Sequence, residues 1–354
     1  GIATNYIKAD FELSDTIANL LPSMVFFWFL ILSIPTGILM NRIGRRNTVL
    51  LSLVVTALAL LIPLLGYSFP VMLISFSLLG IGNTFMQVSL NPLLTNIVSG
   101  EKLASSLTFG QFIKAIASFL APIIAAWAAV RFGDWKILFA IFLVIAILAL
   151  ISLSLVKIKD PERTGKSSTF GECFALLKDK VVLLAFLGIM CHVGIDVGIN
   201  VTAPKILIER LGMGLEDAGY ITSIYFLFRT IGCFSGAFIL ARWSSRIFFI
   251  ISSLMMVVAF GGLFFVNELM PIYICVALIG FGNSNIFPIL FSKALLHLPE
   301  RQNEVSGLMI TGLFGGTIFP FFMGIASDAV ASQIGAIVVM SLGVIYLMAL
   351  SLKS

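Results

Sequence analysis

Eleven long apolar stretches constrain the fold of this chain more than any other feature. Hydrocarbon offers no hydrogen-bond partner, so a chain that crosses it has to satisfy its backbone N–H and C=O groups within helices. At 1.5 Å per residue, about 20 residues cross about 30 Å of hydrocarbon. We therefore predict an all-α membrane protein with helices at residues 17–40, 48–66, 70–98, 105–130, 136–156, 181–206, 217–241, 247–266, 270–296, 306–328 and 334–352.

Composition supports a membrane protein and excludes several other classes. Hydrophobic residues make up 59% of the 354 and charged residues only 11%, whereas soluble domains have about 25% charged residues. The net charge is +5, and no basic run with interleaved aromatic residues indicates nucleic acid. The four cysteines have neither CxxC nor metal-ligand spacing. We expect no disulfide framework, no bound metal and no cofactor.

A polar segment divides the chain into two comparable halves. Residues 157–180, "KIKDPERTGKSSTFGECFALLKDK", form the most polar stretch. We predict an N-terminal bundle at 1–156, a linker with a surface helix at 157–180, and a C-terminal bundle at 181–354. The opening residues "GIATNYIKADFELSD" look like the tail of a further span followed by a polar loop. We therefore expect a first helix that is missing from the sequence.

The distribution of lysine and arginine predicts the orientation, because cytoplasmic loops of membrane proteins are rich in these residues. If residues 41–47, "NRIGRRN", are cytoplasmic, the loops on that side hold 14 basic residues and the outer loops hold five. Both termini then face the cytoplasm, and we expect a multi-pass protein of the inner (plasma) membrane. Lys293 lies near the cytoplasmic end of its span, where we expect its side chain to snorkel towards the headgroups.

An internal repeat links the two halves. "LLGIGNTFMQVSLNP" at 78–92 is answered by "LIGFGNSNIFPIL" at 278–290, which places Gly80 and Gly280 six predicted helices apart. "FLAPIIA" at 119–125 and "IFPFFMGIA" at 318–326 have almost the same offset. Two homologous six-helix halves in pseudo-two-fold repeat enclose a central site near the bilayer midplane, which is typical of transporters. The glycines taken alone have a second interpretation, as small residues that let helices pack closely.

Two loops carry a family resemblance. "GILMNRIGRR" at 37–46 resembles the G-x-x-x-D-R-x-G-R-R signature of the major facilitator superfamily, with Asn41 where the acid is usual, and "GAFILARWSSR" at 236–246 is its counterpart. "IPTGILMNRIG", "NPLLT" and above all residues 286–329 are similar to the fucose/galactose/glucose–proton symporter family. The resemblance implies alternating access and a cytoplasmic latch formed by Arg42, Arg45 and Arg46 with carboxylates or helix ends. We expect Asn41→Asp to strengthen this latch and to favour the outward-open state.

Ionisable residues inside spans are functional candidates, because a charge in the bilayer is costly unless it is paired or faces water. His192, Asp196 and Asn200 recur every four residues and so share one helical face. Other polar stripes follow the spans at 70–98 and 105–130. They comprise Asn83, Gln87 and Asn91, and Gln111, Lys114 and Ser118. Together the stripes favour a water-filled cavity over interhelical hydrogen bonding alone.

Asp196 and Arg229 lie on consecutive spans and are expected to pair. The pair is either a structural salt bridge or a proton-coupling site in which Arg229 keeps Asp196 ionised until a conformational change separates them. His192, one turn from Asp196, either shares the proton or is structural. The resemblance implies a proton-carrying Glu at the position occupied by Gln87, and glutamine carries no proton. The polar residues have therefore been rearranged relative to that family.

We predict a secondary active transporter, with no enzymatic activity, that couples uptake of a monosaccharide to a proton or sodium gradient. Amide and aromatic side chains suit a sugar, and the candidates for contact with it are Asn83, Gln87, Gln111, Lys114, Asn200, Tyr225, Asn283, Asn285 and Phe287. Two cations against one anion also suit a sugar acid or another small organic anion, and a drug/proton antiporter is a further alternative. The expected partners are the substrate and the lipid bilayer, and we expect a monomer.

Overall fold

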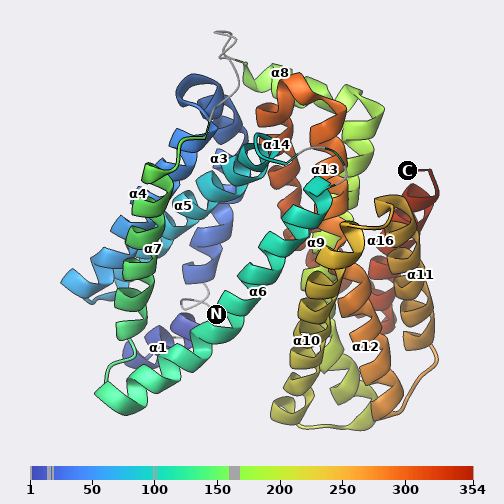
Figure 1. Ribbon diagram of the computed structural model, residues 1–354. Helices are drawn as coiled ribbons and strands as arrows, with labels where there is room; N and C mark the ends of the chain where they lie inside the picture. Colours follow the sequence, from blue (N-terminus) through green and yellow to red (C-terminus); the bar gives the residue numbers. More distant parts are fainter. Residues whose placement is uncertain are drawn as a thin grey trace. The chain divides into compact units, whose positions relative to one another are not determined.

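The computed structural model describes residues 2–13, 17, 20–98, 100, 102–158 and 168–353. All the regular elements within these ranges are helices (Figure 1). The first part of the chain forms α1 (Ile2–Asp10), α3 (Leu20–Ile43), α4 (Arg45–Leu65), α5 (Phe69–Thr95), α6 (Lys102–Phe132), α7 (Ile137–Leu155) and α8 (Phe170–Ala175). The second part forms η1 (Leu176–Lys178), α9 (Lys180–Leu211), α10 (Leu215–Leu240), α11 (Ser245–Leu263), α12 (Leu269–Asn283), α13 (Ile286–His297), η2 (Pro299–Arg301), α14 (Gln302–Thr311), η3 (Gly312–Phe314), α15 (Gly315–Val330) and α16 (Ile334–Lys353).

The helices coincide with the eleven predicted spans. Nine helical segments of the described chain are long and apolar enough to cross a membrane, among them Leu269–His297 and Pro299–Val330, which each join several short elements. Shorter apolar helices, Phe27–Ile43 and Ile123–Phe132, occupy the other two predicted spans. The all-α membrane fold predicted from hydropathy is confirmed, because apolar length alone fixes where helices cross.

The chain forms two compact units whose limits differ from the predicted bundles. Unit 1 comprises Gly1–Ile97, Lys114–Ala175 and Glu300–Thr311, and unit 2 comprises Val98–Ile113, Leu176–Pro299 and Gly312–Ser354. Residues 98–113 of the predicted N-terminal bundle thus belong to unit 2, and residues 300–311 of the predicted C-terminal bundle belong to unit 1. The predicted linker contains α8 and η1, while residues 159–167, which include the basic residues Lys159, Arg163 and Lys166, lie outside the described part.

Specific contacts explain the exchanged segments. In unit 2, the Ser105 hydroxyl of α6 donates to the Ala237 carbonyl of α10 at 2.6 Å. In unit 1, the Ser306 hydroxyl of α14 donates to the Val88 carbonyl of α5 at 2.6 Å. Gly307 lets α14 approach α3, because a Cβ at this position would lie 2.6 Å from the Ser33 carbonyl oxygen.

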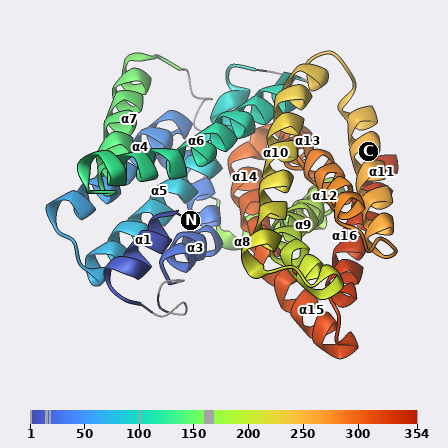
Figure 2. The same cartoon turned by 90° about the horizontal axis from the view of Figure 1, so that it is seen from below.

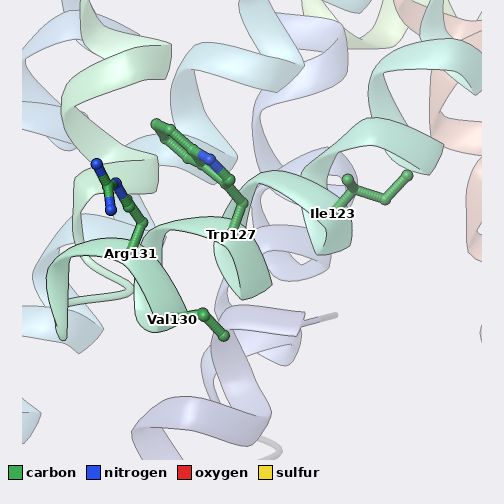
Figure 3. Close-up of a pocket in the computed structure, with 4 residues that line it drawn as sticks. All are labelled: Ile123, Trp127, Val130 and Arg131. Carbon is green, nitrogen blue, oxygen red and sulfur yellow. The ribbon is translucent and has the colours of Figure 1, made fainter.

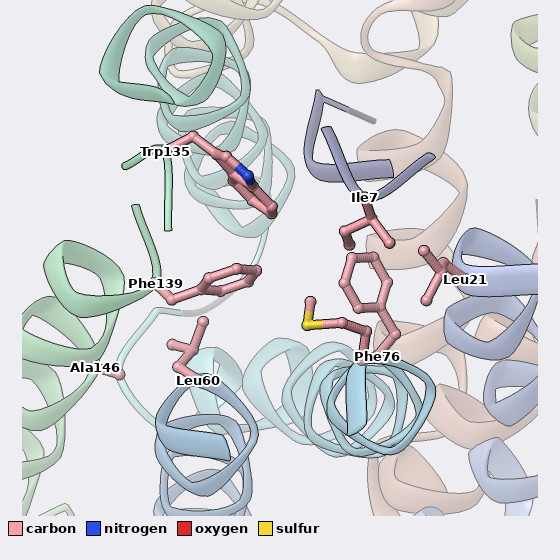
Figure 4. Packing of buried hydrophobic residues seen from close by; sticks show 8 residues of the cluster. Ile7, Leu21, Leu60, Phe76, Trp135, Phe139 and Ala146 are labelled. Carbon is pink, nitrogen blue, oxygen red and sulfur yellow. The ribbon is translucent and has the colours of Figure 1, made fainter. Parts of the chain in front are cut away.

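A buried cluster of apolar side chains fills one end of unit 1 (Figure 4). Trp135 stacks on Tyr6 with ring centroids 5.0 Å apart, and its indole N–H donates to Asp10 at 2.9 Å. The cluster joins α1, α3, α4, α5 and α7 through Ile7, Leu21, Leu60, Met72, Phe76, Trp135, Phe139 and Ala146. In unit 2, α9 contacts α10, α12, α13, α15 and α16, so that it occupies the middle of that unit (Figure 2).

The repeat read from the sequence recurs in the contacts of its glycines. A Cβ on Gly80 would lie 2.8 Å from the Cα of Val25, and one on Gly280 would lie 2.5 Å from the backbone oxygen of Tyr225. The two glycines are 200 residues apart, and their neighbours Val25 and Tyr225 are also 200 residues apart. The same offset relates a second pair, in which Gly82 packs against Ser52 and Thr56 while Gly282 packs against Ser252 and Met256. Each unit uses glycine to bring equivalent helices together, so the packing interpretation and the repeat are both correct.

Gly280→Ala is expected to lower the stability of the protein by about 1–3 kcal/mol, because a methyl group would overlap backbone atoms of α10 that cannot rotate away. Gly261→Ala on α11 is the matched control, since a Cβ there meets nothing within 4 Å. The measurement is the apparent unfolding temperature of both variants in detergent. Equal temperatures for the two variants would show that the close approach at Gly280 is unimportant.

Candidate functional site

An ion pair joins α9 and α10 inside unit 2. Arg229 Nη1 donates to Asp196 Oδ2 at 2.8 Å, and the Tyr225 hydroxyl donates to Asp196 Oδ1. Tyr225 and Arg229 are four residues apart, so they lie on the same face of α10 and reach the two oxygens of one carboxylate. The pairing expected from the sequence is therefore present, and both oxygens of Asp196 are bonded.

A chain of hydrogen bonds extends from this pair to α12 and back to α9. Asn283 Nδ2 donates to the Tyr225 hydroxyl and to the His192 carbonyl, each at 3.2 Å. Asn283 Oδ1 lies 2.8 Å from His192 Nδ1. Because an amide oxygen only accepts, we assign the proton of this bond to His192 Nδ1. Each group donates to the next, and the chain ends on the Asp196 carboxylate.

The ion pair is more exposed to solvent than the groups of the hydrogen-bond chain that extends from it. The side chains of Asp196 and Arg229 are 18% and 26% exposed, whereas Tyr225 and Asn283 are fully buried and His192 is 3% exposed. The sequence predicted Tyr225 and Asn283 to contact substrate. In this structure Tyr225 donates to the Asp196 carboxylate, and Asn283 donates to Tyr225 and to the His192 carbonyl.

The other candidates of unit 2 also contact protein groups. Asn285 is fully buried and donates to the Gly232 carbonyl at 2.9 Å and to the Ser284 hydroxyl at 2.6 Å. Phe287 is buried, with its ring centroid 6.2 Å from that of His192. Asn200 Nδ2 donates to the Asp196 carbonyl at 2.7 Å, while its buried Oδ1 has no partner in the described chain. Gln111, on the α6 segment that belongs to unit 2, is half-buried.

The candidates of unit 1 are more accessible. Asn83 and Gln87 on α5 are half-buried, and Asn91 Nδ2 donates to the main-chain carbonyl of Gln87 at 3.0 Å. Lys114 on α6 is exposed, whereas the Ser118 side chain lies outside the described residues. The polar stripe on α5 thus has two half-buried side chains, Asn83 and Gln87, whereas Asn91 is buried.

A hollow of about 690 Å³ lies along one helix, α6, and is lined by Ile123, Trp127, Val130 and Arg131 (Figure 3). None of the predicted site residues lines it. Ile123, Trp127 and Val130 are exposed apolar side chains on a predicted span. Such a surface is expected of a helix that faces lipid or a neighbouring helix, and we do not assign a substrate site to it.

Arg45 organises a second polar cluster, at the end of unit 1 that the sequence predicts to be cytoplasmic. It is 5% exposed, and its Nη1 donates to the Pro92 carbonyl at 2.9 Å, to the Thr95 hydroxyl at 3.0 Å and to Asn96 Oδ1 at 2.6 Å. Its Nε and Nη2 donate to Asn303 Oδ1 at 2.8 Å and to Gln302 Oε1 at 3.0 Å. Arg45 therefore binds the C-terminal end of α5 and α14 together.

The remaining arginines of the predicted latch lie nearby in the sequence but differ in their contacts. Arg46 donates to the carbonyls of Leu153, Ser154 and Val156 at 2.8–3.0 Å, where α7 ends. The orphan carbonyls of a helix end favour such a cation. Arg42 is exposed on the last turn of α3. These hydrogen bonds of Arg45 and Arg46 thus go to helix ends and to side-chain amides.

Asn41 contacts a carboxylate, which changes the expectation for this position. Asn41 Nδ2 donates to Glu304 Oε1 at 2.9 Å, and Asn303 Nδ2 donates to Asn41 Oδ1 at 2.6 Å. Glu304 is 6% exposed and also accepts from Ser168. In this arrangement we expect Asn41→Asp to weaken the contact rather than to strengthen it, because an aspartate would face the Glu304 carboxylate. Sequence reasoning missed Glu304, whose only signal is the polar run "PERQNEVSG" ahead of a span.

Cys173 on α8 is a natural reporter of this cluster. It is fully buried, and burial, with the nearby Glu304 carboxylate, raises the pKa of its thiol to about 11. Because only the thiolate is alkylated, we expect the rate of maleimide labelling to rise about tenfold per pH unit from pH 7 to pH 10. Peptide mass spectrometry separates Cys173 from the other cysteines. A rate that levels off near pH 9 would contradict the raised pKa.

Comparison with known proteins identifies the family. A family model described as the Major Facilitator Superfamily matches residues 1–320. The chain belongs to the major facilitator superfamily. Members of the major facilitator superfamily are transporters rather than enzymes, so this chain is a multi-pass membrane transport protein.

Individual relatives in the superfamily are distant but extensive. The chain is 26% identical to a glucose/galactose transporter of Brucella abortus, over 92% of this chain and 82% of the relative. It is 25% identical to a hexuronate transporter of Bacillus subtilis, over 67% of this chain and 58% of the relative. A crystal structure of the E. coli fucose:proton symporter has a TM-score of 0.84 at 18% identity and covers 99% of this chain and 94% of that one. At that identity the structural likeness shows the fold alone.

Proposed function

We propose that this protein takes up a neutral monosaccharide together with a proton, by alternating access. The observation that carries the proposal is the partly exposed Asp196–Arg229 pair within the predicted spans of unit 2. Relatives named glucose/galactose transporter support the substrate class. A paired carboxylate and guanidinium have no net charge, which suits an uncharged substrate better than an anion.

The geometry supports a simple coupling step. As a carboxylate, Asp196 accepts one charge-assisted hydrogen bond from Arg229 and one hydrogen bond from Tyr225. A proton on Asp196 removes its negative charge and weakens the bond to Arg229, so the guanidinium becomes available to a sugar oxygen. Substrate and proton then favour each other's binding, which is the reciprocity that symport requires.

The experiment is uptake by the full-length protein in proteoliposomes, with and without an inward proton gradient. We expect gradient-driven uptake of glucose, galactose or fucose that Asp196→Asn abolishes, while substrate exchange without a gradient persists. Uptake that is unaffected by Asp196→Asn would exclude Asp196 as the proton carrier. A sodium gradient in place of the proton gradient tests the other coupling ion.

A sugar acid is the second candidate, and the hexuronate transporter among the relatives favours it. Once Asp196 is protonated, Arg229 is an uncompensated cation that can pair with a substrate carboxylate. The same assay distinguishes the two substrates. Uptake of a hexuronate but of no neutral hexose, with loss in Arg229→Gln, would replace the monosaccharide proposal.

A further inference from the structure

Three lysines surround a hollow of about 200 Å³ in unit 2. Lys180 begins α9, Lys293 lies in the last two turns of α13, and Lys353 ends α16. The sequence predicts that all three helix ends face the cytoplasm. In that orientation we expect the ammonium groups to lie at the level where phospholipid headgroups meet the hydrocarbon.

Carboxylates within the described ranges form no ion pair with the lysines of this hollow. None of the three lysines has an ion pair in the described chain. The carboxylate beside Lys180 belongs to Asp179, which accepts from the Val181 and Val182 N–H groups and pairs with His297 at 3.0 Å. The hydrogen bond from the Val182 N–H, together with those from His297 and the Val181 N–H, holds the pKa of Asp179 below its usual value. Its charge is thus engaged by the end of α9 and by His297.

A fourth cation adds to the charge of the lysines. Arg246 Nη2 donates to the Leu352 carbonyl at 3.0 Å, next to Lys353. The cluster then contains four basic side chains from α9, α11, α13 and α16. Each basic residue near a membrane surface contributes about 1 kcal/mol of attraction to anionic lipid.

The floor and walls of the hollow are apolar. Leu184, Leu290 and Leu350 line it together with the lysines. Gly188 lets Leu290 and Leu350 pack closely against α9, because a Cβ there would lie 2.6 Å from Leu290 Cδ1 and 3.1 Å from Leu350 Cδ2. A soluble anion would find charge here but would gain nothing from these leucines. A ligand with a phosphate and an attached hydrocarbon chain satisfies both surfaces.

We propose that this hollow binds an anionic phospholipid of the cytoplasmic leaflet, with its phosphate on Lys180, Lys293 and Lys353 and an acyl chain along Leu184 and Leu350. The leucines select a lipid over a free phosphate, and the lysines select an anionic over a zwitterionic headgroup. The bound lipid joins the ends of α9, α13 and α16, and α9 is the helix that carries Asp196.

Native mass spectrometry of the full-length protein with phosphatidylglycerol or phosphatidylcholine of equal chain length tests the proposal. We expect phosphatidylglycerol adducts at lower lipid concentration, and roughly a tenfold to hundredfold loss of affinity in Lys180→Gln/Lys293→Gln/Lys353→Gln. The matched control, Lys102→Gln/Lys178→Gln/Arg242→Gln, removes three exposed charges from the same unit and the same predicted face. It should bind as the unsubstituted protein does.

Each contrary outcome overturns the proposal. Equal losses in the two triple variants would mean general attraction of surface charge, and unchanged binding in the first would exclude the hollow. Displacement of the lipid by inorganic phosphate at millimolar concentration would indicate a phosphate site. If the first triple variant does not fold, the exposed Lys353→Gln alone should lower affinity roughly fivefold, and no loss would contradict the site.

Discussion

Asn41→Asp is expected to destabilise unit 1 by about 1–3 kcal/mol, because it replaces a bond to the Glu304 carboxylate with a second carboxylate. Buried like charges at hydrogen-bonding distance are repulsive, and Glu304 is only 6% exposed. The measurements are the apparent unfolding temperature and the labelling rate of Cys173, which should rise as α14 and α8 loosen. The control is Asn47→Asp, which adds the same charge at an exposed position. The Asn47 side chain donates to the Ile43 carbonyl, so this substitution should have little effect.

A second substitution makes this result specific. Glu304→Gln in the Asn41→Asp background should restore most of the stability, because a glutamine amide can donate to the new aspartate. The coupling energy of the double-mutant cycle then measures the pair itself. Additive losses in the double variant, or an Asn41→Asp protein as stable as the Asn47→Asp control, would show that the two positions do not interact.

The second large effect is expected at the intramembrane ion pair. Arg229→Gln leaves the Asp196 carboxylate without its cation inside a predicted span, and an unpaired charge there is costly. Breaking a buried pair costs about 3–5 kcal/mol, and the partial exposure of both side chains reduces this to about 2–3 kcal/mol. We expect a lower yield of folded protein and more than tenfold slower uptake. Lys205→Gln, which removes an exposed cation from the same helix as Asp196, is the control.

The double variant Asp196→Asn/Arg229→Gln distinguishes a structural pair from a functional one. Removing both charges removes the unpaired carboxylate, so the yield and the unfolding temperature should recover. If the pair takes part in transport, gradient-driven uptake stays low in the recovered protein. Full recovery of coupled uptake would mean that the pair serves folding only, and Asp196 would no longer be a candidate proton carrier.

The positions of the helices and the identity of the ion pair were predictable from the sequence. Hydropathy located the spans, because a bilayer requires long apolar helices. Asp196 and Arg229 were expected to pair because an unpaired charge inside the bilayer is costly and the two residues lie on consecutive spans. The 200-residue repeat also predicted that Gly80 and Gly280 have equivalent roles, and their contacts with Val25 and Tyr225 keep that offset.

The partners of the individual polar groups were less predictable. Helical periodicity places residues on one face of a helix but does not say what lies opposite that face. The sequence therefore does not show that Tyr225 and Asn283 are buried and bonded to Asp196 and His192. Glu304 was missed for the same reason, since its partner Asn41 is 263 residues away.

The sequence by itself determined the membrane-spanning helical fold, the two related halves and the intramembrane charges, since hydropathy, repeats and charge are properties of local residue order. Only the tertiary structure decided that segments 98–113 and 300–311 pack in the other unit. It also decided that Asn41 faces a carboxylate and that Lys180, Lys293 and Lys353 share one hollow. Such contacts join residues far apart in the chain, and their geometry depends on how helices pack rather than on where they begin and end.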